Sequence, residues 1–304
     1  MRIKKAKVLM MVVMLVLAGI WSGCDKTLTP RQVNAADSEK SAAKPEAKAH
    51  TDELRAGKNF IATRVYSPQE DQQVLKLFEG LRVADVTDGM DKVGLPNIGL
   101  MSPEIHALWK DAEHYTHRFI GIALTARYVP TNKPSAPAME TEAFNRWVSE
   151  WYNTLSSEPF MPLIRPGTAL ILDDAPDSDV GSIGSNNIMA WKLAGCVGVV
   201  TNATARDTDE IITEKIPLYF RKPGRGIRPG RNEIESVNHP ITCGGVLVEP
   251  GDVIVADGDG VIVVPRARAK EVAEYARATL KGDKAGRKGL YEKLGLKPDD
   301  SVKE

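Results

Sequence analysis

The chain has 304 residues, in which 40 lysines and arginines balance 40 aspartates and glutamates. Proteins that bind nucleic acids carry an excess of basic residues, so this balance gives no electrostatic case for a nucleic-acid partner. The length is ample for one well-buried hydrophobic core.

The first 23 residues are expected to be a signal peptide. A basic start, residues 1–7, precedes an uncharged apolar run from Val8 to Trp21. This layout is typical of a signal peptide, and the run is shorter than the about 20 apolar residues of a membrane-spanning helix. Residues 18–24 resemble a bacterial lipoprotein signal, in which the cysteine is lipidated and becomes the new N-terminus. Trp21 stands where an aliphatic residue is usual, so ordinary cleavage stays open. We expect an exported protein, facing the periplasm or the cell exterior, that is attached to a membrane only through lipid on Cys24.

Residues 24–66 are expected to form a flexible tether. From Asp25 to Thr63 the segment is rich in Ala, Lys, Glu, Ser and Pro, and Phe60 is its only aromatic residue. Such a composition cannot bury enough apolar surface to fold. One domain should then occupy residues 67–283, and residues 284–304 should be a charged, loose tail.

The domain is expected to begin with helices. Apolar residues recur at helical spacing in residues 74–81, and a second short helix covers residues 86–93 before Gly94. A strand is predicted from Gly121 to Val129. The aromatic residues between positions 144 and 155 fall on one helical face, which predicts a further helix.

From residue 168 onward, strands and helices alternate, which predicts an α/β fold. The expected order is a strand at residues 168–172, a helix after Gly184, a strand at residues 197–201 and a short helix from Asp207. Short strands joined by Gly- and Asp-containing turns follow. They cover residues 241–248, 253–256 and 261–264. A last amphipathic helix closes the domain.

Four other patterns suggest special chemistry but have simpler interpretations. Cys196 and Cys243 lie in apolar stretches and should be buried, with a disulfide between them as the alternative. Asp257 to Gly260 is predicted to be a hairpin turn, because the Glu that an EF-hand requires is replaced by Arg268. The basic stretch from Arg221 to Arg231 lacks interleaved aromatic residues and is expected to be a surface loop, suited to a subunit contact. Three histidines match no zinc pattern and are expected at the surface. They are His106, His114 and His117.

Two short segments next to predicted strands are candidate ligand sites. Residues 181–187 lie between a strand and a helix, where free N–H groups and the helix dipole favour an anion. They lack the Lys-Ser/Thr of a phosphate loop, so a small carboxylate fits better than a phosphate chain, and a plain tight turn is the alternative. Arg206 and Asp207 follow a predicted strand, at the edge of the sheet where α/β proteins bind ligands. Asp207 and Glu210 also have capping-box spacing, so Asp207 could instead cap a helix.

Several co-linear segments resemble the 4-hydroxy-4-methyl-2-oxoglutarate aldolase family, which also includes the RraA-like regulators of ribonuclease activity. They are residues 83–90, Gly184 with its helix, and residues 194–200, 205–207, 240–246 and 248–261. The resemblance implies a single-domain RraA-like α-β-β-α sandwich of the swivelling β/β/α type. It also implies a homotrimer or hexamer with its site at a subunit boundary, and a divalent metal, Mg²⁺ or Mn²⁺.

The resemblance further implies roles for the candidate residues. Arg206 would be catalytic and hold the carboxylate and 2-oxo group of a 2-oxo acid, and Asp207 would hold the metal, directly or through water. The expected substrate-binding residues are Gly184, Ser185, Asn186, Asn187 and Arg206. A hard cation and a guanidinium together withdraw charge from the carbonyl, so cleavage of the C3–C4 bond of a 4-hydroxy-2-oxo acid can leave a pyruvate enolate. Oxaloacetate decarboxylation passes through the same enolate.

Two features depart from the family pattern. Ser185 stands where many catalytic relatives have Glu or Asp, which helps organise the water molecules of the metal. The segment from Pro130 to Pro162 is also longer than expected, and its aromatic helix could cover or reshape the pocket. The sequence therefore leaves two functions open, a metal-dependent lyase and a non-catalytic oligomeric binding protein. A methyltransferase would need a glycine-rich cofactor loop, and the sequence has none.

Overall fold

The computed structural model describes residues 45–134, 136–175 and 179–303. The chain divides into two units, residues 1–58 and 59–304. The described part of the first unit contains helix α1 (Pro45–Ala56), so part of the expected tether is helical. Cys24 and the expected signal peptide lie outside the described residues. In the described ranges, no helix combines the length and the apolar character that crossing a bilayer requires.

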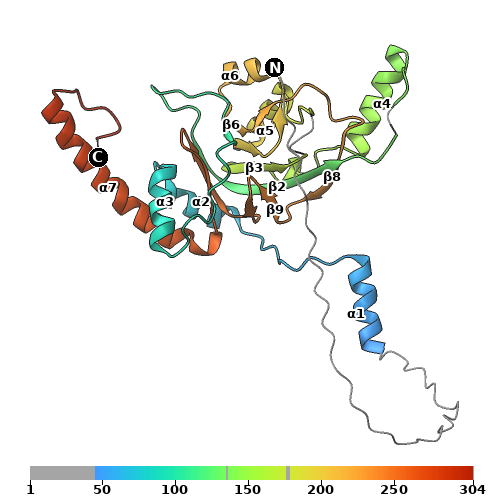
Figure 1. Cartoon of the computed structure of the whole chain (residues 1–304), viewed down its shortest axis with the longest axis horizontal. Helices are drawn as coiled ribbons and strands as arrows, with labels where there is room; N and C mark the ends of the chain where they lie inside the picture. The colour runs from blue at the N-terminus through green and yellow to red at the C-terminus, as the bar shows by residue number, and fades with distance from the viewer. Residues whose placement is uncertain (1–44, 135, 176–178, 304) are drawn as a thin grey trace, which may run out of the picture. The chain divides into compact units, whose positions relative to one another are not determined.

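The described part of the second unit is built on an eight-stranded mixed sheet (Figure 1). Its strand order is β1-β6-β4-β3-β2-β11-β12, and β8 also pairs with β2. The parallel strands are β2 (Phe119–Pro130), β3 (Thr168–Asp173), β4 (Cys196–Thr201) and β6 (Leu218–Phe220). The antiparallel strands are β1 (His106–Ala107), β8 (Asn232–Val237), β11 (Val253–Asp257) and β12 (Gly260–Val264).

Two further strand pairs lie outside this sheet. They are the antiparallel pair β9 (Ile241–Cys243) and β10 (Val246–Val248), and the parallel pair β5 (Thr204–Ala205) and β7 (Lys222–Pro223). The β11–β12 connection confirms the hairpin predicted at Asp257–Gly260. The Asp257 carboxylate accepts hydrogen bonds from the backbone N–H groups of Val83 and Asp259, both at 2.9 Å. It therefore helps to begin a helix and close a turn.

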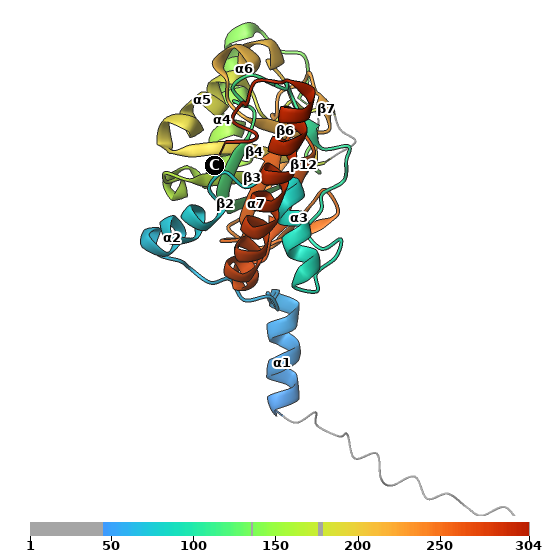
Figure 2. The same cartoon turned by 90° about the vertical axis from the view of Figure 1, so that its left-hand side faces the viewer.

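The helices cover the sheet in two groups. Helices α5 (Ser185–Ala194) and α6 (Thr208–Glu214) pack over the parallel strands. Helices α2 (Pro68–Phe78), α3 (Val83–Lys92) and α7 (Ala269–Leu294) pack over β11 and β12, and Figure 2 shows α3 and α7 side by side in front of β12. Helix α4 (Thr141–Thr154) is the predicted aromatic helix. Short 3₁₀ turns lie at Met161–Leu163 and Arg266–Arg268.

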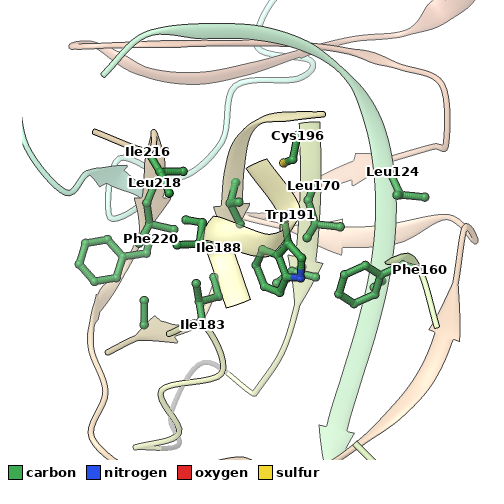
Figure 3. Packing of buried hydrophobic residues seen from close by; sticks show 14 of the residues in the cluster. Leu124, Phe160, Leu170, Ile183, Ile188, Trp191, Cys196, Ile216, Leu218 and Phe220 are labelled. Carbon is green, nitrogen blue, oxygen red and sulfur yellow. The ribbon is translucent and has the colours of Figure 1, made fainter. Parts of the chain in front are cut away.

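Strand β3 shows how the sequence pattern places the core. Side chains alternate between the two faces of a strand. Leu170 and Leu172 pack with α5 and α6, whereas Ala169 and Ile171 pack against the β9–β10 pair. Figure 3 shows the first of these clusters, in which Trp191 of α5 lies beside Phe160. The strand is thus buried on both faces, as is typical of a parallel strand that is covered on both sides.

The structure corrects several expectations. The last helix continues to Leu294, because residues 281–294 contain no β-branched residue and no proline, and it ends at Gly295, which adopts a φ of +65°. His117 is buried, and its Nδ1 accepts a hydrogen bond from the Asp111 N–H at 3.1 Å, whereas the other two histidines are exposed as expected. Burial lowers the pKa of His117. Both cysteines predicted to be buried are buried, and they are free thiols.

Candidate active site

The candidate residues meet where two connections leave the parallel sheet. The segment after β3 and the segment after β4 run side by side, because Ile183 forms a parallel bridge with Ala205. The Arg206 N–H donates to the Ile183 carbonyl at 2.8 Å. This register places Gly184 beside Arg206 and Asp207. The site therefore lies at the carboxyl ends of parallel strands, where α/β proteins bind ligands.

Asp207 adopts a left-handed backbone conformation, with φ 55° and ψ 39°. An N-cap residue usually lies in the β region, and the Asp207 side chain makes no capping hydrogen bond to α6. Its Oδ2 instead accepts a hydrogen bond from the Ser185 N–H at 3.1 Å and lies 3.5 Å from the Ser185 Oγ. Asp207 therefore stands at the N-cap position of α6, but its side chain does not cap that helix and its carboxylate points toward α5.

The guanidinium of Arg206 lies next to this carboxylate. The Arg206 Nε is 3.6 Å from the Asp207 Oδ1, and the two side chains are 37% and 34% exposed, so both can reach a ligand. The methylene stem of Arg206 passes over Gly181, where a Cβ would lie 2.6 Å from the Arg206 Cβ. A side chain at position 181 would therefore displace the arginine.

Gly184 is surrounded by three polar atoms of the site. A Cβ at this position would lie 2.8 Å from the Asp207 Oδ2, 3.4 Å from the Asn187 Oδ1 and 3.7 Å from the Arg206 Nε. The φ of Gly184 is −124°, which any residue can adopt, so glycine is required here by space and not by backbone conformation. Three of the predicted site residues thus converge on one small region.

Helix α5 begins at this region with Ser185. Its N-cap is Gly184, which has no side chain to cap the first turn. The Ser185 N–H already donates to Asp207, so the N–H groups of Asn186 and Asn187 are the next candidates for an anion. Asp207 lies where the positive end of the helix dipole stabilises a carboxylate.

A residue that the sequence analysis missed joins the site from the long segment between β2 and β3. The Glu158 carboxylate accepts hydrogen bonds from the Asn187 Nδ2 at 2.7 Å and the Trp191 Nε1 at 2.8 Å, both on α5. It also pairs with Arg228. No periodic pattern marks Glu158, because its partners lie between 29 and 70 positions away in the sequence. The long segment therefore contributes to the surroundings of the site.

Arg228 corrects the prediction that the whole basic stretch is a surface loop. Its side chain is 4% exposed, and its guanidinium lies 5.2 Å from the ring centroids of both Tyr128 and Tyr152. Its Nη1 donates to the Tyr128 hydroxyl at 2.7 Å, and burial raises the pKa of Tyr128. Arg225 of the same stretch is exposed, as expected, and pairs with Asp179. Through Glu158 and Tyr152, the buried arginine holds the stretch against the long segment between β2 and β3.

A buried polar network supports the loop that precedes Gly184. The Asp174 carboxylate accepts hydrogen bonds from the Ser182 hydroxyl and from the Asn232 Nδ2, the latter at 2.8 Å. Asn232 in turn accepts through its Oδ1 from the Ser156 hydroxyl at 2.8 Å. Burial raises the pKa of Asp174, and these hydrogen bonds oppose that shift. Because its members are buried and bonded, the network holds Ser182 in place, two residues before Gly184.

The donor set at the site fits a hard divalent cation. Among the described residues, no group of three or more His, Cys, Asp and Glu side chains could hold a metal. The site offers one carboxylate, from Asp207, and neutral oxygens from Asn187 and Ser185. Mg²⁺ is usually bound through one or two carboxylates together with water and substrate oxygens. Asp207 would hold such a cation, with most of the remaining ligands supplied by water and substrate.

The second unit is thus an α/β domain with an Arg-Asp pair and a glycine-containing loop at the ends of parallel strands. Residues 83–263 match the family model RraA-like, described as Aldolase/RraA. This match covers more than half of the chain, and the chain belongs to the RraA-like family. The predicted RraA-like α/β fold is confirmed.

Individual relatives agree with this assignment. A Halalkalibacterium halodurans protein provisionally named 4-hydroxy-4-methyl-2-oxoglutarate aldolase is 29% identical over 130 residues, which cover 42% of this chain and 61% of the relative. A Thermus thermophilus protein named 4-hydroxy-4-methyl-2-oxoglutarate aldolase is 30% identical over 102 residues, covering 33% of this chain and 60% of the relative. The chain thus matches about 60% of the length of each relative.

Solved structures show the same fold. An uncharacterized protein from Pseudomonas syringae is similar with a TM-score of 0.58 and 25% identity, and the similarity covers 76% of this chain and 97% of that one. Streptomyces coelicolor RraAS2, described as an unusual member of the RNase ES inhibitor RraA protein family, has a TM-score of 0.56 and 21% identity, with coverages of 74% and 99%.

Proposed function

We propose that this protein is a divalent-metal-dependent lyase that cleaves a 4-hydroxy-2-oxo acid to pyruvate in a retro-aldol reaction, with oxaloacetate decarboxylation as a related activity. The observation that carries the proposal is the convergence of the Arg206 guanidinium, the Asp207 carboxylate and the N-terminus of α5 on Gly184. The names of the aldolase relatives support it.

The residues of the chain have distinct tasks in this reaction. Arg206 binds the carboxylate and 2-oxo oxygens with its planar fork and stays protonated. The 4-hydroxyl gives its proton to water and becomes the carbonyl of the second product as the C3–C4 bond breaks. The electron pair of that bond passes into the pyruvate enolate, Arg206 stabilises the charge that develops on the 2-oxo oxygen, and C3 of the enolate then takes a proton from water to give pyruvate. Asp207 would hold the cation, which supplies Lewis-acid stabilisation of the same oxygen when bound. The N–H groups of Asn186 and Asn187 bind the other side of the substrate carboxylate.

The second candidate is a non-catalytic oligomeric binding protein. It is favoured by Ser185, which supplies no carboxylate where many catalytic relatives have one, so that Asp207 is the acidic residue at Gly184. A binding protein would need the site only for a ligand or a partner. It would release pyruvate from no 2-oxo acid.

A panel of 2-oxo acids tests the first candidate against the second. Pyruvate release is measured with Mg²⁺, with Mn²⁺ and with EDTA, for the wild type, Arg206→Lys and the control Arg64→Lys. Arg64 is an exposed arginine paired with Glu70, so its replacement should leave activity unchanged. We expect metal-dependent release that Arg206→Lys lowers by about a hundredfold or more, because a point charge cannot replace a two-oxygen fork. No release from any substrate with either metal would leave the binding protein as the function.

Assembly into a trimer or hexamer, with the site at a subunit boundary, is part of the proposal. Helix α5, which begins at the site, carries two exposed apolar side chains, Met189 at 42% and Leu193 at 91%. Burial of exposed apolar side chains of this kind against a second subunit lowers the free energy of the assembly. Light scattering at micromolar concentration tests the assembly, and a monomer would remove the argument for a shared site.

Export and lipidation of Cys24 complete the proposal. The basic start, the apolar run and the small residues before Cys24 support them. Mass spectrometry of the membrane fraction should find a mature chain that begins at Cys24 and carries lipid. An unmodified N-terminus, or a Cys24→Ser variant that stays at the membrane, would contradict lipidation.

A further inference from the structure

We propose that Glu158 is a positioning residue of the site, which holds the Asn187 amide so that its carbonyl oxygen faces the Asp207 carboxylate and serves as a second oxygen donor for the cation. This inference rests on the proposed function. It makes the segment between β2 and β3 a working part of the site.

The chemistry of the two side chains fixes the orientation of the amide. The Glu158 carboxylate can only accept hydrogen bonds, so Asn187 must turn its Nδ2 toward Glu158, at 2.7 Å. The Asn187 Oδ1 then points to the opposite side. It lies 3.4 Å from the position of a Cβ on Gly184, and the Asp207 Oδ2 lies 2.8 Å from the same position. A carbonyl oxygen and a carboxylate oxygen therefore share one small region.

Glu158 is itself held in place. Its Oε1 accepts from Asn187 and Arg228, and its Oε2 accepts from the Trp191 Nε1 at 2.8 Å. The Trp191 ring packs edge-on against Phe160, two residues after Glu158, with centroids 5.6 Å apart, and both rings are buried (Figure 3). The carboxylate thus has donors on both oxygens and cannot turn away without leaving the buried Arg228 unpaired.

This arrangement explains how the site can work with Ser185. The sequence leaves position 185 without a carboxylate, and Asn187, two residues further along α5, brings a neutral oxygen within 3.4 Å of the Cβ position of Gly184. Amide oxygens are suitable ligands for hard cations, directly or through water. Because residues behind the ligands orient them, replacing such a residue typically weakens metal binding by about 10- to 100-fold.

Binding of Mn²⁺ to the full chain, measured by titration calorimetry and by electron paramagnetic resonance, tests the donor. Asn187→Ala removes the amide and leaves Glu158, Trp191 and Arg228 in place. We expect its dissociation constant for Mn²⁺ to rise about tenfold or more. The matched control Asn153→Ala, at an exposed asparagine of α4, should bind as the wild type does. An Asn187→Ala variant with wild-type affinity, or a wild type that binds no Mn²⁺, would overturn the proposal.

A double-mutant cycle tests the positioning role. Glu158→Gln should weaken Mn²⁺ binding about tenfold in the wild type and have no further effect in Asn187→Ala, because Glu158 acts through that amide. Equal weakening in both backgrounds would show a general structural role and overturn the positioning claim. If Glu158→Gln does not fold, Glu158→Gln/Arg228→Met removes both charges and takes its place in the cycle. Mn²⁺ binding that follows these expectations without pyruvate release would refute the proposed reaction and leave this inference intact.

Discussion

Replacing Gly184 with alanine tests the geometry of the site without removing a polar group. The added Cβ would lie 2.8 Å from the Asp207 Oδ2 and 3.4 Å from the Asn187 Oδ1. A carbon and an oxygen atom need about 3.5 Å, so the Asp207 carboxylate must move by roughly half an ångström or more. The end of the Asp207 side chain can move by rotation about its side-chain bonds, and we expect this movement to relieve the strain.

The effect on stability should be small. Gly184 has φ −124° and ψ 167°, a conformation that alanine adopts freely, so reduced entropy of the unfolded chain contributes about 0.4–1 kcal/mol in favour of folding. Weakening the hydrogen bond from the Ser185 N–H to Asp207 costs about 1 kcal/mol. The two terms nearly cancel, and the free energy of unfolding should change by less than about 1 kcal/mol.

The effect on function should be large. A displaced carboxylate no longer presents its oxygens to the cation, and binding sites lose function when their groups move by about 0.5 Å. We expect Mn²⁺ affinity and pyruvate release each to fall about tenfold or more. Urea unfolding, calorimetry and the pyruvate assay measure the three quantities. Gly286→Ala, on α7 with open space at its Cβ, is the control and should change only stability. A Gly184→Ala variant with wild-type affinity and activity would refute the described placement of Asp207.

Three further predictions concern single side chains. Asp207→Asn should have a free energy of unfolding within about 1 kcal/mol of the wild type, because asparagine tolerates the left-handed conformation. Its metal-dependent activity should fall about a hundredfold, and retained activity would contradict the metal role. Arg228→Met should lower the free energy of unfolding by about 3 kcal/mol in urea titrations, because it leaves the Glu158 carboxylate without its buried partner, and a loss below about 1 kcal/mol would count against that pair. Burial raises the pKa of Asp252 to about 6, above its ordinary 3.8. The folded state therefore binds this proton more tightly than the unfolded chain, and the contribution of Asp252 to stability falls as the pH rises from about 4 to about 7. The free energy of unfolding of Asp252→Asn relative to the wild type should rise by on the order of 2 kcal/mol over that range, and a constant difference would contradict the pKa shift.

The predictable parts of the fold depend on local patterns. The strand predicted from Gly121 to Val129, the Asp-Gly turn between β11 and β12, and the helix after Gly184 all follow from residues that are close in sequence. The position of Arg206 and Asp207 at the end of β4 was predictable for the same reason. Each feature needs only strand period, turn chemistry and connection order.

The role of the Asp207 side chain and the place of Glu158 in the site could not be predicted from the sequence, because both depend on backbone angles or on contacts between residues far apart in the sequence. Capping-box spacing suggested a helix cap at Asp207, but spacing does not specify the backbone angles, and a φ of 55° turns the side chain toward α5. The contact between Glu158 and Asn187 joins residues 29 positions apart, and the pair of Glu158 with Arg228 spans 70. Such polar pairs depend on how the long segment packs, and no periodicity in the sequence specifies that.

The distribution of bonded polar groups supports the proposed roles of Arg206 and Asp207. Behind the loop, Asp174 is fully engaged by buried donors, and beside it Glu158 is engaged by three donors. These groups cannot bind a substrate without breaking hydrogen bonds inside the protein, which would leave buried polar atoms unpaired. Arg206 and Asp207 contact each other only at 3.6 Å and are each about one-third exposed. The buried networks therefore fix the loop and the helix, and the exposed pair keeps the unused hydrogen-bonding capacity that a ligand requires.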